Sequence, residues 1–194
     1  MNLPFYAQLI NLFAALLLLL SFAMLAQRRI RSLINLFAAQ GLVLVLSTLV
    51  VAYSTHQNHL YYSALLTLAL KVLILPWIMH RLIRALNVRW DVETLIDIPV
   101  TMLIGIALVI FAFNLATPIS QIAGTVTKST IGIATACILL AFLMMITRRK
   151  AVSQVIGFLA MENGLFLAAT SATYGMPMVV ERSEERRVGK ECRL

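Results

Sequence analysis

The stretch LPFYAQLINLFAALLLLLSFAMLA, residues 3–26, contains no charged side chain. A helix rises about 1.5 Å per residue, so about 20 apolar residues cross the roughly 30 Å hydrocarbon core of a bilayer. A removable signal peptide would have a basic region before its apolar run and a small-residue cleavage site after it, and neither is present. We therefore predict that residues 3–26 form a retained membrane span.

The composition of the whole chain extends this prediction. Of its 194 residues, 61% are hydrophobic and 12% are charged, and the mean hydropathy is +0.91. A soluble domain has about 25% charged residues. Five more apolar runs follow the first, at about 33–54, 59–84, 97–116, 127–147 and 151–174. The sequence predicts an all-α, polytopic bundle of about six transmembrane helices.

Basic residues cluster in alternate loops, after the first, third and fifth predicted spans. The clusters are Arg28, Arg29 and Arg31, then Arg81, Arg84 and Arg89, then Arg148, Arg149 and Lys150. The intervening loops have no basic residue apart from Lys128 at the start of the fifth span. The positive-inside rule makes Arg28, Arg29, Arg148 and Arg149 topology anchors in the cytoplasm and places the N-terminus outside. Topology therefore explains the net charge of +8 better than nucleic-acid binding does.

Glu162 lies near the middle of an apolar run, in GFLAMENGLFLAA, residues 157–169. A charge at the centre of a membrane helix costs about 2.5–3.5 kcal/mol on insertion scales. The carboxyl group could be neutral and hydrogen-bonded to another helix, or it could be a proton relay, which the sequence favours. Asn163 adds a polar neighbour, and Gly164 allows close approach of another backbone.

Lys71 lies near the middle of the third predicted span, five residues before Pro76. Proline has no amide to donate to the carbonyl of residue 72, so we expect the helix to kink or open there. The membrane–water interface is about ten residues away in each direction along the helix, which is too far for the lysine side chain to reach by snorkelling. Lys71 therefore suits a water-filled path or a carboxylate partner. A direct pair with Glu162 is left open.

The other titratable residues point to no metal site. His56 and His59 share a short loop, and Cys137 lies in an apolar run, where a thiol acts as a small hydrophobe. His80 could change charge near neutral pH and support a relay, although an interfacial histidine is commoner. In the polar loop of residues 84–99, the acidic residues could pair with Arg84 and Arg89, contact a partner, or be solvated. The last of these acids, Asp97, also suits a helix N-cap.

The last thirteen residues, RSEERRVGKECRL at 182–194, break the apolar trend. Residues 182–192 resemble, residue for residue, the translation of a widely used sequencing adapter. We therefore expect residues 182–194 to be a non-native tail that follows an authentic part ending at Glu181.

The segment TRRKAVSQVIGFLAMENGLFLAATSATYG resembles the K subunit of respiratory complex I, in which an Arg-Arg loop precedes a helix with a mid-membrane glutamate. Arg148, Arg149 and Glu162 occupy the matching positions. Residues 1–181 as a whole resemble hydrogenase-4 component E, a membrane subunit of formate-hydrogenlyase-type complexes. Residues 1–116 would then form four N-terminal spans and residues 127–181 the complex-I-K-like part. A further helix with a second acidic residue, a seventh span, would be missing.

The resemblance implies a proton-translocating subunit in the bacterial inner (plasma) membrane. Its partners would be antiporter-like membrane subunits, a nickel–iron hydrogenase module and the lipid bilayer, with no nucleic acid. It would be a non-catalytic part of an oxidoreductase complex, with no metal, flavin or quinone cofactor of its own. Two alternatives stay open: a structural scaffold subunit of the same complex, and a subunit of a multi-subunit cation/proton antiporter.

The chain also contains a weak internal repeat. Residues 27–45, QRRIRSLINLFAAQGLVLV, parallel residues 147–167, TRRKAVSQVIGFLAMENGLFL, if a small gap is allowed. This alignment sets Gln40 against Glu162, so we expect the first half, with an amide in place of an acid, to be mainly structural. Gln40 and Asn163 are possible relay or support residues.

Overall fold

A computed structural model describes residues 5–55, 65–66, 68–85, 95–120 and 125–170. The helices are α1 (Phe5–Ala26), α2 (Ile30–Thr55), the π-helix η1 (Leu68–Ile74), α4 (Leu75–Ala85), α5 (Ile98–Ser120) and α6 (Thr125–Thr147). A further helix spans Ala151–Thr170 and is named helix 151–170 below. These residues form no strand, which confirms the all-α prediction.

Within the described ranges, five helices are long and apolar enough to cross a membrane. The candidate spans are Gln8–Ala26, Ile30–Tyr53, Ile98–Thr117, Thr130–Thr147 and Ala151–Thr170. They match the first, second, fourth, fifth and sixth predicted spans. The third, at 59–84, lies partly outside the described residues, and its described part includes η1 and α4. The chain is a helical membrane protein, and the total of six spans stays a prediction.

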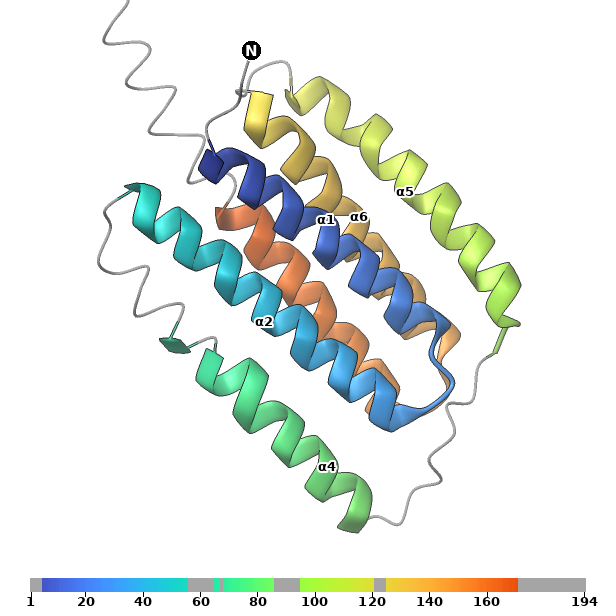
Figure 1. The fold of residues 1–194 in the computed structure, drawn as a ribbon. Coiled ribbons are helices and arrows are strands. Elements are labelled where there is room, and N and C mark those ends of the chain that lie inside the picture. The colour runs from blue at the N-terminus through green and yellow to red at the C-terminus, as the bar shows by residue number, and fades with distance from the viewer. Residues whose placement is uncertain (1–4, 56–64, 67, 86–94, 121–124, 171–194) are drawn as a thin grey trace, which may run out of the picture.

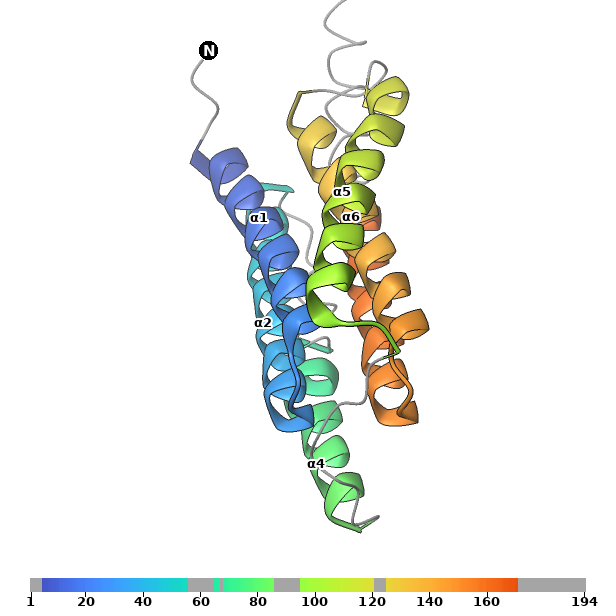
Figure 2. The same cartoon turned by 90° about the vertical axis from the view of Figure 1, so that its right-hand side faces the viewer.

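The helices form two layers. Figure 2 shows α1, α2 and α4 on one side, and α5, α6 and helix 151–170 on the other. Helix α1 packs against α2, α5 and α6. Helices α4 and α5 lie at opposite edges of the bundle (Figure 1).

Two hairpins with Arg-Arg turns make up the centre of the bundle: α1 with α2, and α6 with helix 151–170. Arg148, in the second turn, donates from Nη2 to the carbonyl oxygens of Leu25 at 2.7 Å and Met24 at 3.3 Å. These carbonyls belong to the last turn of α1, where intrahelical donors are absent and the helix dipole favours a cation. Arg148 therefore joins the two hairpins.

The structure adds a role for Arg148 to the predicted one. The sequence grouped four arginines as topology anchors, which stays a prediction, and Arg28, Arg29 and Arg149 are exposed. Arg148 is only 1% exposed. Burial lowers the pKa of Arg148, but a guanidinium group keeps its charge at neutral pH. This arginine is a buried helix cap as well as a basic loop residue.

Two glycines let helix 151–170 approach α6 closely. A Cβ added at Gly157 would lie 2.9 Å from Met145 Cγ, and one at Gly164 would lie 2.9 Å from Ile138 Cγ1 and 3.2 Å from the Ile138 backbone nitrogen. Small residues allow such contacts between membrane helices. The close approach predicted at Gly164 is confirmed.

The apolar core is divided into two clusters along the bundle. The larger cluster contains Met24, Leu25, Ile30, Leu33, Ile34, Phe37, Met79, Leu140, Ala141, Leu143, Met144, Ile156 and Ala160. The smaller contains Ala14, Leu17, Leu44, Ile133, Ala134, Cys137 and Leu167. Three buried polar residues, Ser21, Gln40 and Asn163, fall between members of the two clusters on α1, α2 and helix 151–170. They form a polar layer across the middle of the bundle.

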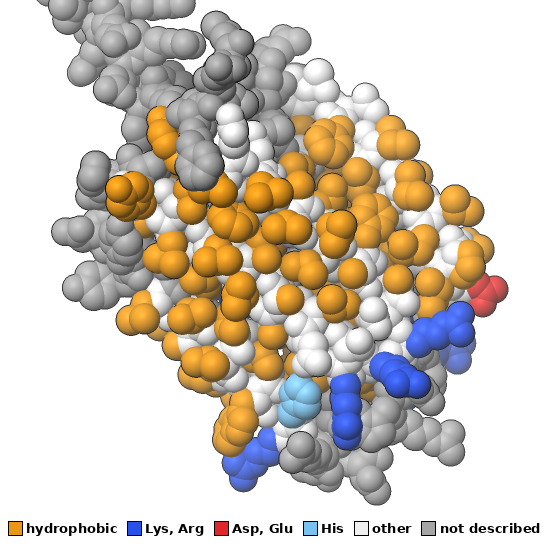
Figure 3. All heavy atoms as spheres, viewed as in Figure 1, with side chains coloured by type: hydrophobic (Ala, Val, Ile, Leu, Met, Phe, Trp, Pro, Cys, Tyr) orange, Lys and Arg blue, Asp and Glu red, His pale blue; other side chains and the backbone are white. Residues whose placement is uncertain are grey.

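The face of the molecule drawn in Figure 3 is apolar over most of its length, and the Lys and Arg side chains on this face gather at one end. This segregation agrees with the predicted basic loops, and which side is cytoplasmic stays a prediction. Asp97 directly precedes α5, and its backbone carbonyl accepts from the Thr101 amide at 3.0 Å. It therefore occupies the predicted N-cap position.

Candidate functional site

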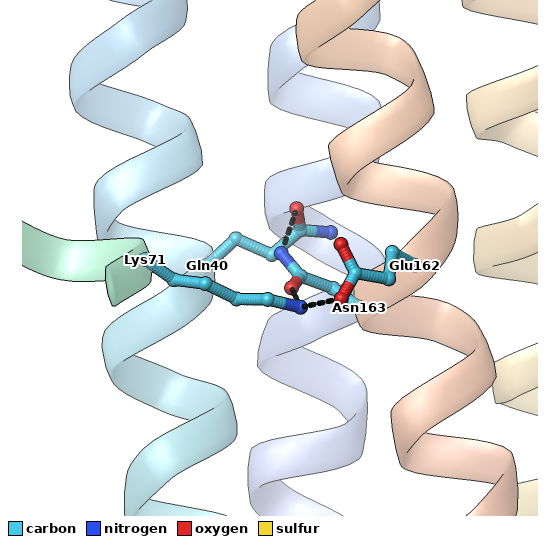
Figure 4. A network of polar contacts seen from close by, with 4 residues as sticks. All are labelled: Gln40, Lys71, Glu162 and Asn163. Carbon is cyan, nitrogen blue, oxygen red and sulfur yellow. Dashed lines mark hydrogen bonds and ion pairs between the residues drawn. The ribbon is translucent and has the colours of Figure 1, made fainter. Parts of the chain in front are cut away.

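Lys71 reaches the bundle interior from a widened helical turn. The π-helix η1 ends at Ile74, two residues before Pro76. Proline cannot donate a backbone hydrogen bond, and single π-helical turns occur frequently at functional sites. The predicted departure from regular α-helix beside Lys71 is confirmed. Lys71 is 8% exposed, and Figure 4 shows its side chain extending from η1 toward helix 151–170.

Helix η1 contacts α2 beside Gly41. A Cβ added at Gly41 would lie 3.5 Å from Lys71 Cβ and 3.5 Å from Val72 Cγ2, which is ordinary contact distance. Space for a methyl group therefore remains between η1 and α2 at this point, and the Lys71 side chain extends beyond α2 to helix 151–170.

The ammonium group of Lys71 contacts two side chains of helix 151–170. Its Nζ lies 3.2 Å from Glu162 Oε1 and donates to Asn163 Oδ1 at 2.9 Å (Figure 4). The two members of the ion pair differ in exposure: the Lys71 side chain is 10% exposed and the Glu162 side chain 52%. The pair left open by the sequence is therefore formed, with its carboxylate on the outer surface of the chain.

Beyond Asn163, hydrogen bonds continue inward across the polar layer. Asn163 Nδ2 donates to Gln40 Oε1 at 3.2 Å, and Gln40 Nε2 donates to Ser21 Oγ at 3.0 Å. Ser21 Oγ donates to the Leu17 carbonyl at 2.9 Å. Every donor points the same way, from the lysine toward α1, and the chain ends on a backbone acceptor.

The chemical groups of the inner chain determine what it can do. Carboxamide groups donate and accept hydrogen bonds but do not titrate near neutral pH. When every donor and acceptor of a buried polar network has a partner, the network makes the core more rigid and fixes how the helices pack against each other. Gln40 and Asn163, predicted as possible relay or support residues, therefore fit the supporting role and hold Lys71 in position.

Ser21 belongs to the site, although the sequence did not predict it as a site residue. It is one polar residue in the apolar run of residues 3–26, and serine is common in membrane helices, where it bonds to its own backbone. The sequence indicates only that Ser21 and Gln40 lie at roughly similar depths, because each is several residues from the predicted cytoplasmic end of its span. Its contact with Gln40 depends on how α1 and α2 pack.

His80 is not joined to this network. Its Nδ1 lies 2.8 Å from the Pro76 carbonyl oxygen, one turn back along the same helix. No described contact links it to Lys71 or Glu162. The geometry favours the commoner interpretation, a histidine bonded locally near a helix end.

The depth of the site follows from its sequence positions. Glu162 is the twelfth of the twenty residues in the span Ala151–Thr170, which places it within about 3 Å of the span's middle. A lone charge there would be costly, whereas an ion pair has no net charge. The ion pair between Lys71 and Glu162, which has no net charge, therefore lies near the middle of this span.

Comparisons with known proteins leave the family open. No family model and no solved structure matches the chain. The chain is 33% identical over 109 residues to the uncharacterized protein Rv0085 of Mycobacterium tuberculosis. The match covers 56% of this chain and 50% of that protein, so the chain spans about half the length of this relative.

Several residues singled out in the sequence lie outside the described part of the structure. They are His56, His59, Arg89, Asp91 and Glu93 (acidic residues of the polar loop at 84–99), the side chains of Arg84 and Lys128, and the tail at 182–194.

Proposed function

We propose that this chain is a membrane subunit of a hydrogenase-4 or formate-hydrogenlyase-type complex in the bacterial inner membrane, and that it contributes to proton translocation. The observation that supports this most is the ion pair between Lys71 and Glu162, 3.2 Å apart at mid-membrane. The resemblance to hydrogenase-4 component E supplies the kind of complex. Electron transfer would occur in the hydrogenase module, and this chain would supply protonatable groups and no cofactor.

The geometry suggests how a proton would pass. In the resting state the ammonium of Lys71 and the carboxylate of Glu162 neutralise each other. A proton that arrives at Glu162 removes the negative charge and weakens the ion pair. Lys71 keeps its hydrogen bond to Asn163 Oδ1, so the ammonium is not left without an acceptor. Loss of the proton from Glu162 restores the pair.

Isosteric replacement of the carboxyl group tests this function. Glu162→Gln keeps the size and polarity of the side chain but removes its titration. Groups that transfer protons typically contribute about 100-fold or more to a rate, so we expect a loss of that order in proton uptake by inverted vesicles. Copurification with the other subunits should be normal.

The matched control is Asn114→Ala on α5. Asn114 is an exposed polar residue of another span, and its Nδ2 donates to its own helix at the Ile110 carbonyl. Its replacement should change neither assembly nor proton uptake. Normal proton uptake by an assembled Glu162→Gln complex would refute the relay function.

The two alternative functions make different predictions. A scaffold subunit would tolerate Glu162→Gln and Lys71→Met, or would lose assembly with either change. A subunit of a cation/proton antiporter would retain the carboxylate requirement but would be encoded beside antiporter genes alone. Hydrogenase and iron–sulfur genes in the neighbourhood would favour the proposed complex.

A further inference from the structure

The outward face of helix 151–170 combines apolar residues with the carboxylate. Val155, Phe158 and Leu165 are 44%, 52% and 50% exposed, and the Glu162 side chain is 52% exposed. These four residues follow one another at intervals of three or four, so they share one side of the helix. We name this set the Glu162 face.

The outward face of α5 provides a contrast. Leu103, Ile106 and Ile110 are 67%, 50% and 59% exposed and are purely apolar. The exposed polar side chains in the same helix, Asn114 and Thr117, donate to backbone carbonyls one turn earlier. Such a surface suits lipid, because its polar groups are satisfied within the helix.

The carboxylate of Glu162 does not meet that condition. Among the described residues, its one contact is the pair between Oε1 and Lys71. Half of the side chain faces outward at a depth where water is absent from bare lipid. A carboxylate there needs a further hydrogen-bond donor, and the described residues supply none.

Among the described residues, the inner side of the site gives a proton no clear exit from Glu162. The chain through Asn163, Gln40 and Ser21 consists of amides and a hydroxyl, and its last residue, Ser21, is bonded to the Leu17 carbonyl and to the buried Cys137 thiol. The described residues therefore favour the outward face as the side on which Glu162 exchanges its proton.

We propose that the Glu162 face is the docking surface for a membrane helix of a partner chain. This helix presents a lysine, histidine or protonated carboxylic acid to the outward side of Glu162. Phe158 and Leu165, about one turn away on each side, pack against it and exclude lipid from the polar contact. The role of this donor in proton exchange rests on the proposed function, whereas the docking itself rests on exposure and charge.

A second copy of the chain does not fit this face. Two Glu162 faces in contact would bring two carboxylates together at mid-membrane. Like charges repel strongly where the dielectric constant is low, and each Lys71 is already held by its own Glu162 and Asn163. The occupant required by charge complementarity is a donor, not another acceptor.

Photo-crosslinking in native membranes tests the docking surface. Benzoylphenylalanine is placed at Phe158 or Leu165, with Ile106 and Ile110 on α5 as matched exposed controls, and the crosslinked peptides are identified by mass spectrometry. We expect adducts from positions 158 and 165 to one membrane helix that has a protonatable residue within about one turn of the crosslink. Positions 106 and 110 should give no protein adduct above background.

Three results would overturn the proposal. They are adducts to lipid alone at positions 158 and 165, adducts to a second copy of this chain, and adducts to a partner helix that lacks a protonatable residue.

A bulky substitution separates the failure of this inference from that of the proposed function. Leu165→Trp leaves Lys71 and Glu162 in place but enlarges the Glu162 face, and Ile110→Trp makes the same change on α5. We expect Leu165→Trp to lower both copurification of the partner and proton uptake several-fold, with no effect of Ile110→Trp. If Glu162→Gln abolishes uptake but Leu165→Trp does not reduce it, the docking surface is wrong and the relay stands. If Glu162→Gln has no effect while Leu165→Trp disrupts copurification, the relay is wrong and the docking surface stands.

Discussion

The two central hairpins, α1 with α2 and α6 with helix 151–170, share a pattern and differ in one ionisable group. Each has an Arg-Arg turn and a buried amide followed by glycine at mid-membrane: Gln40 and Gly41 in the first, Asn163 and Gly164 in the second. The two amides bond to each other at 3.2 Å. Glu162 directly precedes the second amide and points outward, and the first hairpin has alanine at the corresponding place.

The predicted repeat, which sets Gln40 against Glu162, stays a prediction. The structure adds a direct hydrogen bond between Gln40 and Asn163. The two amides therefore stabilise the contact between the hairpins. The carboxylate is an addition on the outer side of the second hairpin, where it meets Lys71.

The largest expected effect is that of Lys71→Met, which removes the cation that neutralises the second hairpin. The carboxylate of Glu162 would lose its partner, and Asn163 Oδ1 its donor. We expect at least about a 100-fold loss of proton uptake. Lys71→Met should also lower the free energy of unfolding by about 1–3 kcal/mol.

Its control is the double variant Lys71→Met with Glu162→Gln. Removing the unpaired charge should restore part of the lost stability in a thermal unfolding series. A double variant less stable than Lys71→Met would show that the ion pair is not what couples these residues.

Arg148→Met and Arg28→Met compare the stability contributed by one arginine in each Arg-Arg turn. Arg148 is buried against the last carbonyls of α1, whereas Arg28 is exposed. Loss of a charged hydrogen bond to buried carbonyls should cost about 1.5–3 kcal/mol, and the exposed change less than about 0.5 kcal/mol. Thermal unfolding in detergent measures both, and equal effects would contradict the buried cap.

The two glycines are compared by Gly164→Ala and Gly41→Ala. The new Cβ would be 2.9 Å from Ile138 Cγ1 in the first variant but at ordinary contact distance from Lys71 in the second. Overpacking should cost about 1–2 kcal/mol at Gly164, while alanine at Gly41 should be neutral or slightly stabilising because it favours helix. A neutral Gly164→Ala would contradict the close approach to α6.

The smallest expected effect is that of Ser21→Ala, at the inner end of the amide chain. Gln40 Nε2 would lose its acceptor, which should cost about 1 kcal/mol of stability. Proton uptake should be retained, because the serine supports Gln40 and does not exchange protons with Glu162. A loss of uptake as large as that of Glu162→Gln would make the inner chain part of the proton path.

Much of the fold could be predicted because membrane helices leave a local signal in sequence. Runs of about 20 apolar residues must satisfy their backbone groups within the helix, so length and composition identify them. Glu162 and Lys71 could be singled out for the same reason, since ionisable residues are rare in such runs. The proline at position 76 likewise predicted the irregular turn beside Lys71.

The remaining features depend on how the helices rotate and pack. Nothing local shows that Arg148 is buried while Arg149 is exposed, because both lie in one turn. The link from Ser21 to Gln40 depends on α1 facing α2, and the outward direction of Glu162 depends on the rotation of helix 151–170. Packing between helices sets such rotations.

The central claim is that protonation changes occur at Glu162 and not along the inner chain of Asn163, Gln40 and Ser21. Infrared difference spectra recorded during turnover measure protonated carboxyl groups directly. We predict a carboxyl band that appears during turnover, persists in Ser21→Ala, and is lost in Glu162→Gln. A carboxyl band that remains unchanged in Glu162→Gln would contradict this account.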